Sequence, residues 1–178
     1  MPLPTAIISP ITLDEVNAMS EIDFISHFGP LFENSSWVAR ETWRLHPFTS
    51  RSDLLNKLIS TMRRSPLDMR IKLIQAHPDL AGRLAREGRL THDSVQEQAS
   101  AGLDHLSAEE IRQFEIYNEQ YKAKFGFPFV ICARLNDKRT ILVAFQRRLS
   151  LSRDAEIQTA VDEIEKIAAL RLAPLIRP

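Results

Sequence analysis

Residues 152–172 read SRDAEIQTAVDEIEKIAALRL, a stretch without glycine or proline. Its apolar side chains recur three or four positions apart, at Ile157, Val161, Ile164 and Ala168. This is the spacing of one face of an α-helix and not the strict alternation of a β-strand. The stretch therefore predicts a long helix with one apolar face.

Helical spacing continues through the rest of the chain, where glycine and proline are scattered. Ser107 and Glu110 have the spacing of a capping box that opens a helix, which Gly126 ends. Ser65-Pro66 is typical of an N-cap followed by proline at the first helical position. Other helices are expected over residues 13–19, 23–28, 53–62, 91–101 and 140–149 and around Trp37 and Trp43, with a buried extended segment over residues 125–131.

These patterns predict one compact all-α, multi-helix domain over residues 1–178, with its core over about residues 12–172. The 23 basic and 23 acidic residues cancel, so no strong field would attract nucleic acid or an anionic membrane. No apolar run is long enough to span a bilayer, and residues 1–10 lack the pattern of a signal peptide. A cytoplasmic protein with neither nucleic acid nor membrane as partner is expected.

The single cysteine, Cys132, lies in an apolar run, which favours a packed core thiol over a reactive one. The sequence contains no HExxH, Cys-x-x-Cys or close His pair with a carboxylate, so no metal site is expected. It also lacks a glycine-rich phosphate loop and a G-x-S-x-G elbow. These absences argue against nucleotide and acyl-enzyme chemistry.

Arg171 is the next member of the apolar face formed by residues 157–168, so its guanidinium would point toward the core. The alternative is that it lies in the last turn and reaches water, where it favours the helix dipole. His77 precedes Pro78, which places it at or just past a helix end. Its imidazole could transfer protons near neutral pH, although a lone histidine is more often structural.

Ser94 and Glu97 have two competing interpretations. Their spacing is that of a capping box. The same spacing places Ser94, Glu97 and Gln98 on one helical face, where a hydroxyl, a carboxylate and an amide could bind a urea-like solute. The sequence alone leaves both interpretations open.

These segments, taken together and in order, resemble the 2-oxo-4-hydroxy-4-carboxy-5-ureidoimidazoline (OHCU) decarboxylases. The resemblance covers residues 12–172. Each motif is short, but the ordered set is specific to that family. The matching positions are residues 32–37 (FENSSW), 76–82 (AHPDLAG), 90–91 (LT), 94 (S), 97–99 (EQA), 101–104 (AGLD), 121 (Y), 125–131 (FGFPFVI), 147–149 (RRL) and 170–172 (LRL).

The resemblance implies a cofactor-free and metal-free decarboxylase of urate degradation that forms (S)-allantoin from OHCU. It implies His77 as the catalytic acid/base, with Glu97 and Arg171 as further catalytic residues. The substrate-binding positions that it implies are Pro78, Ser94, Val95, Gln96, Glu97 and Gln98, together with Phe129, Val130, Ile131, Cys132 and Ala133. A homodimer is also implied, with functional coupling to urate oxidase and 5-hydroxyisourate hydrolase.

The chain departs from the family pattern at Leu151, where relatives often carry Asn, and at residues 135–137, where a glycine-containing turn is more usual. Residues 176–178 lack the peroxisomal Ser-Lys-Leu signal, which favours a bacterial cytoplasmic protein. Two other functions remain open: a non-catalytic helical module that binds a purine-derived ligand or a partner, and a ureide hydrolase with Glu97 as base. The decarboxylase hypothesis predicts that His77 lies within reach of Glu97 and opposite Arg171.

Overall fold

The computed structural model describes residues 10–177. Residues 1–9, where a signal peptide was sought, and Pro178, the last residue of the C-terminal tripeptide, lie outside the described residues. Residues 10–177 form helices and one isolated β-bridge, with no strand, and the all-α prediction is confirmed. No helix in this part of the chain is long and apolar enough to cross a membrane. The chain divides into two compact units, Met1–Arg64 with Ala168–Pro178 and Ser65–Ile167. Whether they form one domain stays a prediction.

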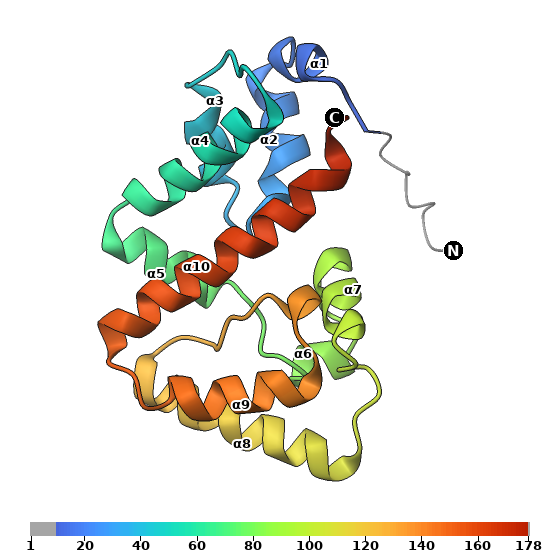
Figure 1. The fold of residues 1–178 in the computed structure, drawn as a ribbon, viewed down its shortest axis with the longest axis vertical. Coiled ribbons are helices and arrows are strands. Elements are labelled where there is room, and N and C mark those ends of the chain that lie inside the picture. Colours follow the sequence, from blue (N-terminus) through green and yellow to red (C-terminus); the bar gives the residue numbers. More distant parts are fainter. Residues whose placement is uncertain (1–9, 178) are drawn as a thin grey trace. The chain divides into compact units, whose positions relative to one another are not determined.

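Between residues 10 and 64 the first unit has four α-helices, and it also includes the end of the final helix (Figure 1). The Thr12 side chain caps the first helix, and Glu15 completes the capping box. Ser20 caps the second helix, which begins two residues before the predicted start because the Ser20 hydroxyl accepts the Asp23 N–H. The elements are α1 (Leu13–Asn17), α2 (Glu21–Phe28), η1 (Gly29–Leu31), α3 (Trp37–Trp43), α4 (Arg51–Arg64) and η3 (Ala173–Leu175).

An aromatic cluster forms the core of the first unit. The Phe24 ring lies 4.7 Å from Phe28 and 5.5 Å from Phe48, measured between ring centroids. On α4, Leu54 and Leu58 are fully buried, as the apolar spacing of that helix predicts. The first and last described segments of the chain meet in this unit, where the Ile11 N–H donates to the Leu175 carbonyl.

The second unit contains α5 (Leu67–Gln75), α6 (Arg83–Arg86), α7 (His92–Ser100), α8 (Ala108–Phe125), η2 (Ala133–Leu135) and α9 (Lys138–Arg148). The last helix, α10 (Arg153–Leu172), belongs to this unit as far as Ile167. The expected capping box at Ser107 and the left-handed Gly126 are both confirmed. The predicted N-cap at Ser65 is wrong by one residue: Pro66, with an extended ψ of 149°, takes the cap position and α5 begins at Leu67.

Tyr121 is at the centre of the aromatic core of the second unit. Its ring contacts those of Phe125 and Phe129 at centroid distances of 4.6 and 5.2 Å, and Phe129 stacks on Phe145 at 3.8 Å. Residues 127–132 have no regular secondary structure and are buried, which confirms the predicted buried segment from Phe127 onward. Its first two predicted residues differ: Phe125 is the last residue of α8, and Gly126 is the exposed cap of that helix. This segment is therefore fixed by aromatic packing rather than by a backbone ladder.

Candidate functional site

His77 lies just past the end of α5, as its position before Pro78 predicts. Its N–H donates to the Ile74 carbonyl at 3.2 Å, and its Nδ1 lies 2.9 Å from the Leu73 carbonyl oxygen. A carbonyl oxygen can only accept, so Nδ1 carries the hydrogen in this contact. The neutral ring then has its lone pair on Nε2, so Nε2 is its basic nitrogen.

The loop after His77 is held by side chains from two helices. Gln98 on α7 accepts the Ala81 N–H at 2.9 Å, and Asn118 on α8 donates to the Leu80 carbonyl at 2.9 Å. Lys122 pairs with Asp79 at 2.6 Å. A Cβ at Gly82 would lie 2.7 Å from the Asp79 Cβ, so this close turn requires glycine. The segment that follows the His77 imidazole is thus anchored to α7 and α8.

Helix α7 carries the predicted polar face. Thr91 is its N-cap and accepts the Ser94 N–H at 3.3 Å, so Ser94 lies inside the first turn. The interpretation of Ser94 as an N-cap is therefore wrong. Ser94 and Gln98 are buried and Glu97 is half-buried, whereas the neighbouring Val95 and Gln96 are exposed.

The buried segment at Phe129–Ala133 meets this helix at its end, because Ala133 is the first residue of η2 and η2 packs on α7. Burial raises the pKa of the Cys132 thiol, and the carboxylates of Glu163 and Glu97 raise it further. The Cys132 side chain is a packed thiol, as predicted. Two of the predicted binding segments, residues 94–98 and 129–133, are thus neighbours in the structure.

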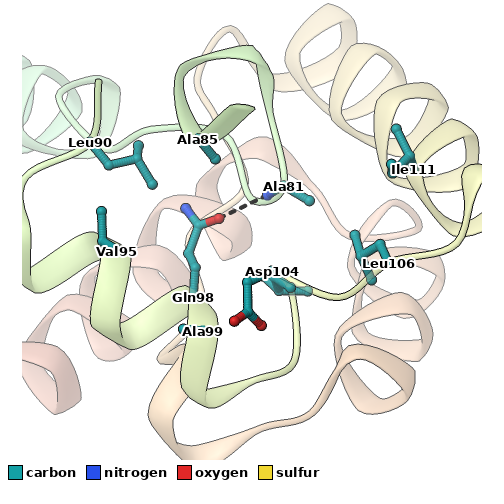
Figure 2. Close-up of a pocket in the computed structure, with 10 residues that line it drawn as sticks. Ala81, Ala85, Leu90, Val95, Gln98, Ala99, Asp104, Leu106 and Ile111 are labelled. Atoms are coloured by element: carbon teal, nitrogen blue, oxygen red, sulfur yellow. Dashed lines mark hydrogen bonds between the residues drawn. The ribbon is translucent and has the colours of Figure 1, made fainter. Parts of the chain in front are cut away.

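A cavity of about 340 Å³ lies beside α7 on the side of Gln98 (Figure 2). The Gln98 amide oxygen in it already accepts the Ala81 N–H, and most of the other lining groups are apolar. Such a lining offers few partners to the donors and acceptors of a carboxylated ureide. The lining residues are Ala81, Ala85, Leu90, Val95, Gln98, Ala99, Leu103, Asp104, Leu106 and Ile111.

Arg171 belongs to the first unit, in the last turn of α10. Its side chain is only 6% exposed, and both Nη atoms lie 3.3 Å from Glu33 Oε2. Nη1 also donates to the Pro30 carbonyl at 3.1 Å. The alternative in which this side chain reaches water is therefore wrong.

The sequence profile of OHCU decarboxylases matches residues 17–173. This chain belongs to the OHCU decarboxylase family. It is 40% identical to the OHCU decarboxylase of Xenopus laevis over 92% of this chain and 93% of that protein. It is 37% identical to the OHCU decarboxylase of Halalkalicoccus jeotgali, covering 94% and 93% of the two chains. It is also 37% identical to the uric acid degradation bifunctional protein PucL of Bacillus subtilis, of which it spans 33%.

Solved structures share the fold of this family member. A crystal structure of (S)-allantoin synthase matches with a TM-score of 0.76 and 25% identity, over 94% of this chain and 54% of that chain. A crystal structure of OHCU decarboxylase in the presence of (S)-allantoin matches with a TM-score of 0.65 over 79% of this chain and 90% of that chain. At 23% identity, the second likeness shows the fold alone.

Two residues of this OHCU decarboxylase family member were not singled out from the sequence. Glu33, 138 residues from Arg171, pairs with it, and Asn118 anchors the loop after His77. A carboxylate between Phe32 and Asn34 in a matching motif was the available signal for Glu33. Within residues 10–177, no group of three or more His, Cys, Asp or Glu side chains is arranged to hold a metal ion.

Proposed function

We propose that this chain decarboxylates OHCU to (S)-allantoin, with His77 as its catalytic acid/base. The observation that carries the proposal is the family match over residues 17–173, which includes the His77-Pro78 motif with its fixed imidazole tautomer. The Leu73 carbonyl holds Nδ1 as a donor, so Nε2 is the basic nitrogen that exchanges a proton with the substrate.

The chemistry of the substrate explains why neither metal nor organic cofactor is needed. Breaking the carbon–carboxylate bond releases carbon dioxide and leaves an electron pair, which moves into the adjacent C=N of the ring. The substrate is therefore its own electron sink. The protein has to orient the carboxylate out of the ring plane, stabilise charge on the ring and deliver a proton to one face. Delivery by His77 to one face yields a single enantiomer.

The other proposed roles follow from the groups that each residue presents. Glu97 on α7 and the backbone of residues 129–133 bind the ring and ureido group, and Arg171 contacts substrate oxygens through its guanidinium. The tautomer of His77 is already set by Leu73, so Glu97 serves the ureido nitrogens rather than Nδ1. The contact of His77 with Glu97 and the placement of Arg171 opposite His77 stay predictions.

The test generates OHCU from urate with the two upstream enzymes and follows allantoin by circular dichroism. The chain should accelerate formation of the (S) enantiomer, and His77→Asn should lower that acceleration by about 10²–10⁴-fold. His46→Asn is a matched control, because His46 also precedes a proline and its Nδ1 contacts the Trp43 carbonyl at 2.6 Å. It should keep full activity.

Four results would contradict parts of this proposal. Racemic allantoin at the spontaneous rate would favour a non-catalytic module that binds a purine-derived ligand or partner. Release of ammonia or a ring-opened product would favour the ureide hydrolase with Glu97 as base. Retained activity in His77→Asn would remove the role of that imidazole. Loss of activity after prolonged chelation or dialysis would contradict the cofactor-free mechanism.

We also propose that the chain forms a homodimer. Leu135 and Val143, 60% and 64% exposed, line an open hollow of about 430 Å³ and offer apolar surface to a second copy. Light scattering after gel filtration should give twice the mass of one chain, and a monomer would contradict the proposal. The cytoplasmic location and the coupling to urate oxidase and 5-hydroxyisourate hydrolase stay predictions.

A further inference from the structure

The side chains of Arg148, Glu163 and Asn136 hold the backbone of the buried segment at Phe129–Ala133. Arg148 Nη1 donates to the Val130 carbonyl at 2.7 Å, and Glu163 Oε2 accepts the Cys132 N–H at 2.8 Å. The Cys132 carbonyl accepts from Asn136 Nδ2 at 3.0 Å. Cys132 itself is extended, with φ −70° and ψ 93°. The peptide groups of Val130 and Cys132 are thus turned toward the interior of the second unit.

In a trans peptide group, the C=O of one residue and the N–H of the next point in opposite directions. The N–H and C=O of Ile131 therefore face away from Arg148 and Glu163. Ile131 is only 8% exposed, and within residues 10–177 its N–H and C=O make no hydrogen bond to the protein. Buried peptide groups are almost always paired, so a ligand is the expected partner of this donor and acceptor.

Arg148 and Glu163, which bond to the buried segment, are themselves fixed by ion pairs. Arg148 and Glu156 have side-chain exposures of 2% and 0%, and Arg148 Nε lies 2.6 Å from Glu156 Oε1. Glu163 is 12% exposed, and its second oxygen pairs with Lys166 at 2.6 Å. Buried ion pairs add little to stability compared with apolar residues of the same volume. Their effect here is to fix the direction of individual peptide groups.

We propose that Glu163 is a positioning residue for substrate binding, acting through the Cys132 N–H. Together with Arg148, it turns the peptide so that the Ile131 N–H and C=O form a donor–acceptor pair for an amide edge of the substrate. A ureide or cyclic urea presents a neighbouring N–H and C=O, which are complementary to that pair. This role rests on the proposed function, since it assigns the ureide of OHCU as the group bound.

The test compares Glu163→Ala, Glu163→Gln and a matched control, Lys166→Ala, in the coupled circular-dichroism assay. Glu163→Ala should raise KM about tenfold with kcat within about threefold, because binding by Ile131 is lost from substrate and transition state alike. Glu163→Gln keeps an oxygen that accepts the Cys132 N–H and should keep the wild-type KM. Lys166→Ala removes the ion pair but not the backbone contact and should also keep it.

Calorimetric binding of (S)-allantoin supplies a readout that does not need turnover. Its Kd should rise about tenfold in Glu163→Ala and stay unchanged in the other two variants. If Glu163→Ala fails to fold, Glu163→Asp withdraws the carboxylate from Cys132 while keeping its charge and should raise KM and Kd in the same way. Unchanged KM and Kd in the variant that lacks the contact, or an equal rise in Lys166→Ala, would overturn the positioning role.

The two proposals fail differently. A wild-type chain that binds (S)-allantoin without accelerating its formation would refute the decarboxylase function, while the Kd series would still test Glu163. A wild-type chain that accelerates the reaction, with no KM or Kd change in Glu163→Ala, would refute the positioning role alone. A wild-type chain that neither binds nor turns over would overturn both.

Discussion

Arg148 and Arg171 carry the same sequence signal in different units. Arg148 follows Ile141 and Phe145 on the buried face of α9, and Arg171 follows the apolar face of α10. Both side chains are nearly enclosed, at 2% and 6% exposed, and each pairs with a buried carboxylate. Their surroundings nevertheless differ.

The Arg148 guanidinium is held by short hydrogen bonds from its Nε and Nη1 atoms. It pairs with Glu156 at 2.6 Å, donates to the Val130 carbonyl and lies 4.2 Å over the Phe129 ring. The Arg171 guanidinium contacts Glu33 at 3.3 Å, longer than charge-assisted bonds of about 2.7–2.9 Å. The difference indicates that the first arginine orders the interior of its unit. The contact of Arg171 with Glu33 is the longer of the two, and the proposed contact of Arg171 with a substrate anion stays a prediction.

The largest effect is expected from Arg148→Met. This change leaves Glu156 fully buried without its cation and should lower the free energy of unfolding by about 3–5 kcal/mol. Urea unfolding at neutral pH measures the loss. Adding Glu156→Leu removes the unpaired carboxylate and should restore most of the stability. If Arg148→Met alone lowered the free energy of unfolding by less than about 1 kcal/mol, the Arg148–Glu156 pair would not be tight.

The next effect concerns activity rather than stability. Arg171→Met combined with Glu33→Gln removes both charges of the Arg171–Glu33 pair. The free energy of unfolding, measured in urea, should therefore change by about 1–2 kcal/mol at most. The value of kcat/KM for OHCU should fall about 100-fold, because a guanidinium contact to the substrate is lost. Glu33→Gln alone keeps the guanidinium and should retain most activity. Normal kcat/KM in the double variant would assign Arg171 a purely structural role.

The accuracy of the sequence predictions depended on whether their signals were local. The capping box at Ser107, the left-handed Gly126 and the position of His77 past α5 are set within a few residues of each site. They were predicted correctly for that reason. At Ser94 the local signals competed, since Thr91 and Ser94 both precede a possible cap partner by three residues, and the hydroxyl of Thr91 takes the position.

The partners of the buried charges were not predictable, because they come from distant parts of the chain. Glu33 is 138 residues from Arg171, and Glu163 is 31 residues from the Cys132 N–H that it accepts. No periodicity connects such pairs. Burial of Arg148 was predictable in principle, because residues 141, 145 and 148 have the same spacing that indicated a core position for Arg171.

The smallest effect tests how completely solvent is excluded from Arg148, Glu156 and Tyr121, which contact one another through the Glu156 carboxylate. Burial and the hydrogen bond to Glu156 raise the pKa of the Tyr121 phenol above its ordinary value. In the unfolded chain a tyrosine ionises near pH 10, so this contribution to stability is complete below that pH and declines as pH rises above it. In Tyr121→Phe, the alkaline decline in urea-measured stability should therefore be shallower than in wild type. The tyrosinate absorbance of the folded protein should titrate with the same amplitude in both. A smaller amplitude in the variant would mean that solvent reaches the phenol and that the Arg148 pair is no more enclosed than the Arg171 pair.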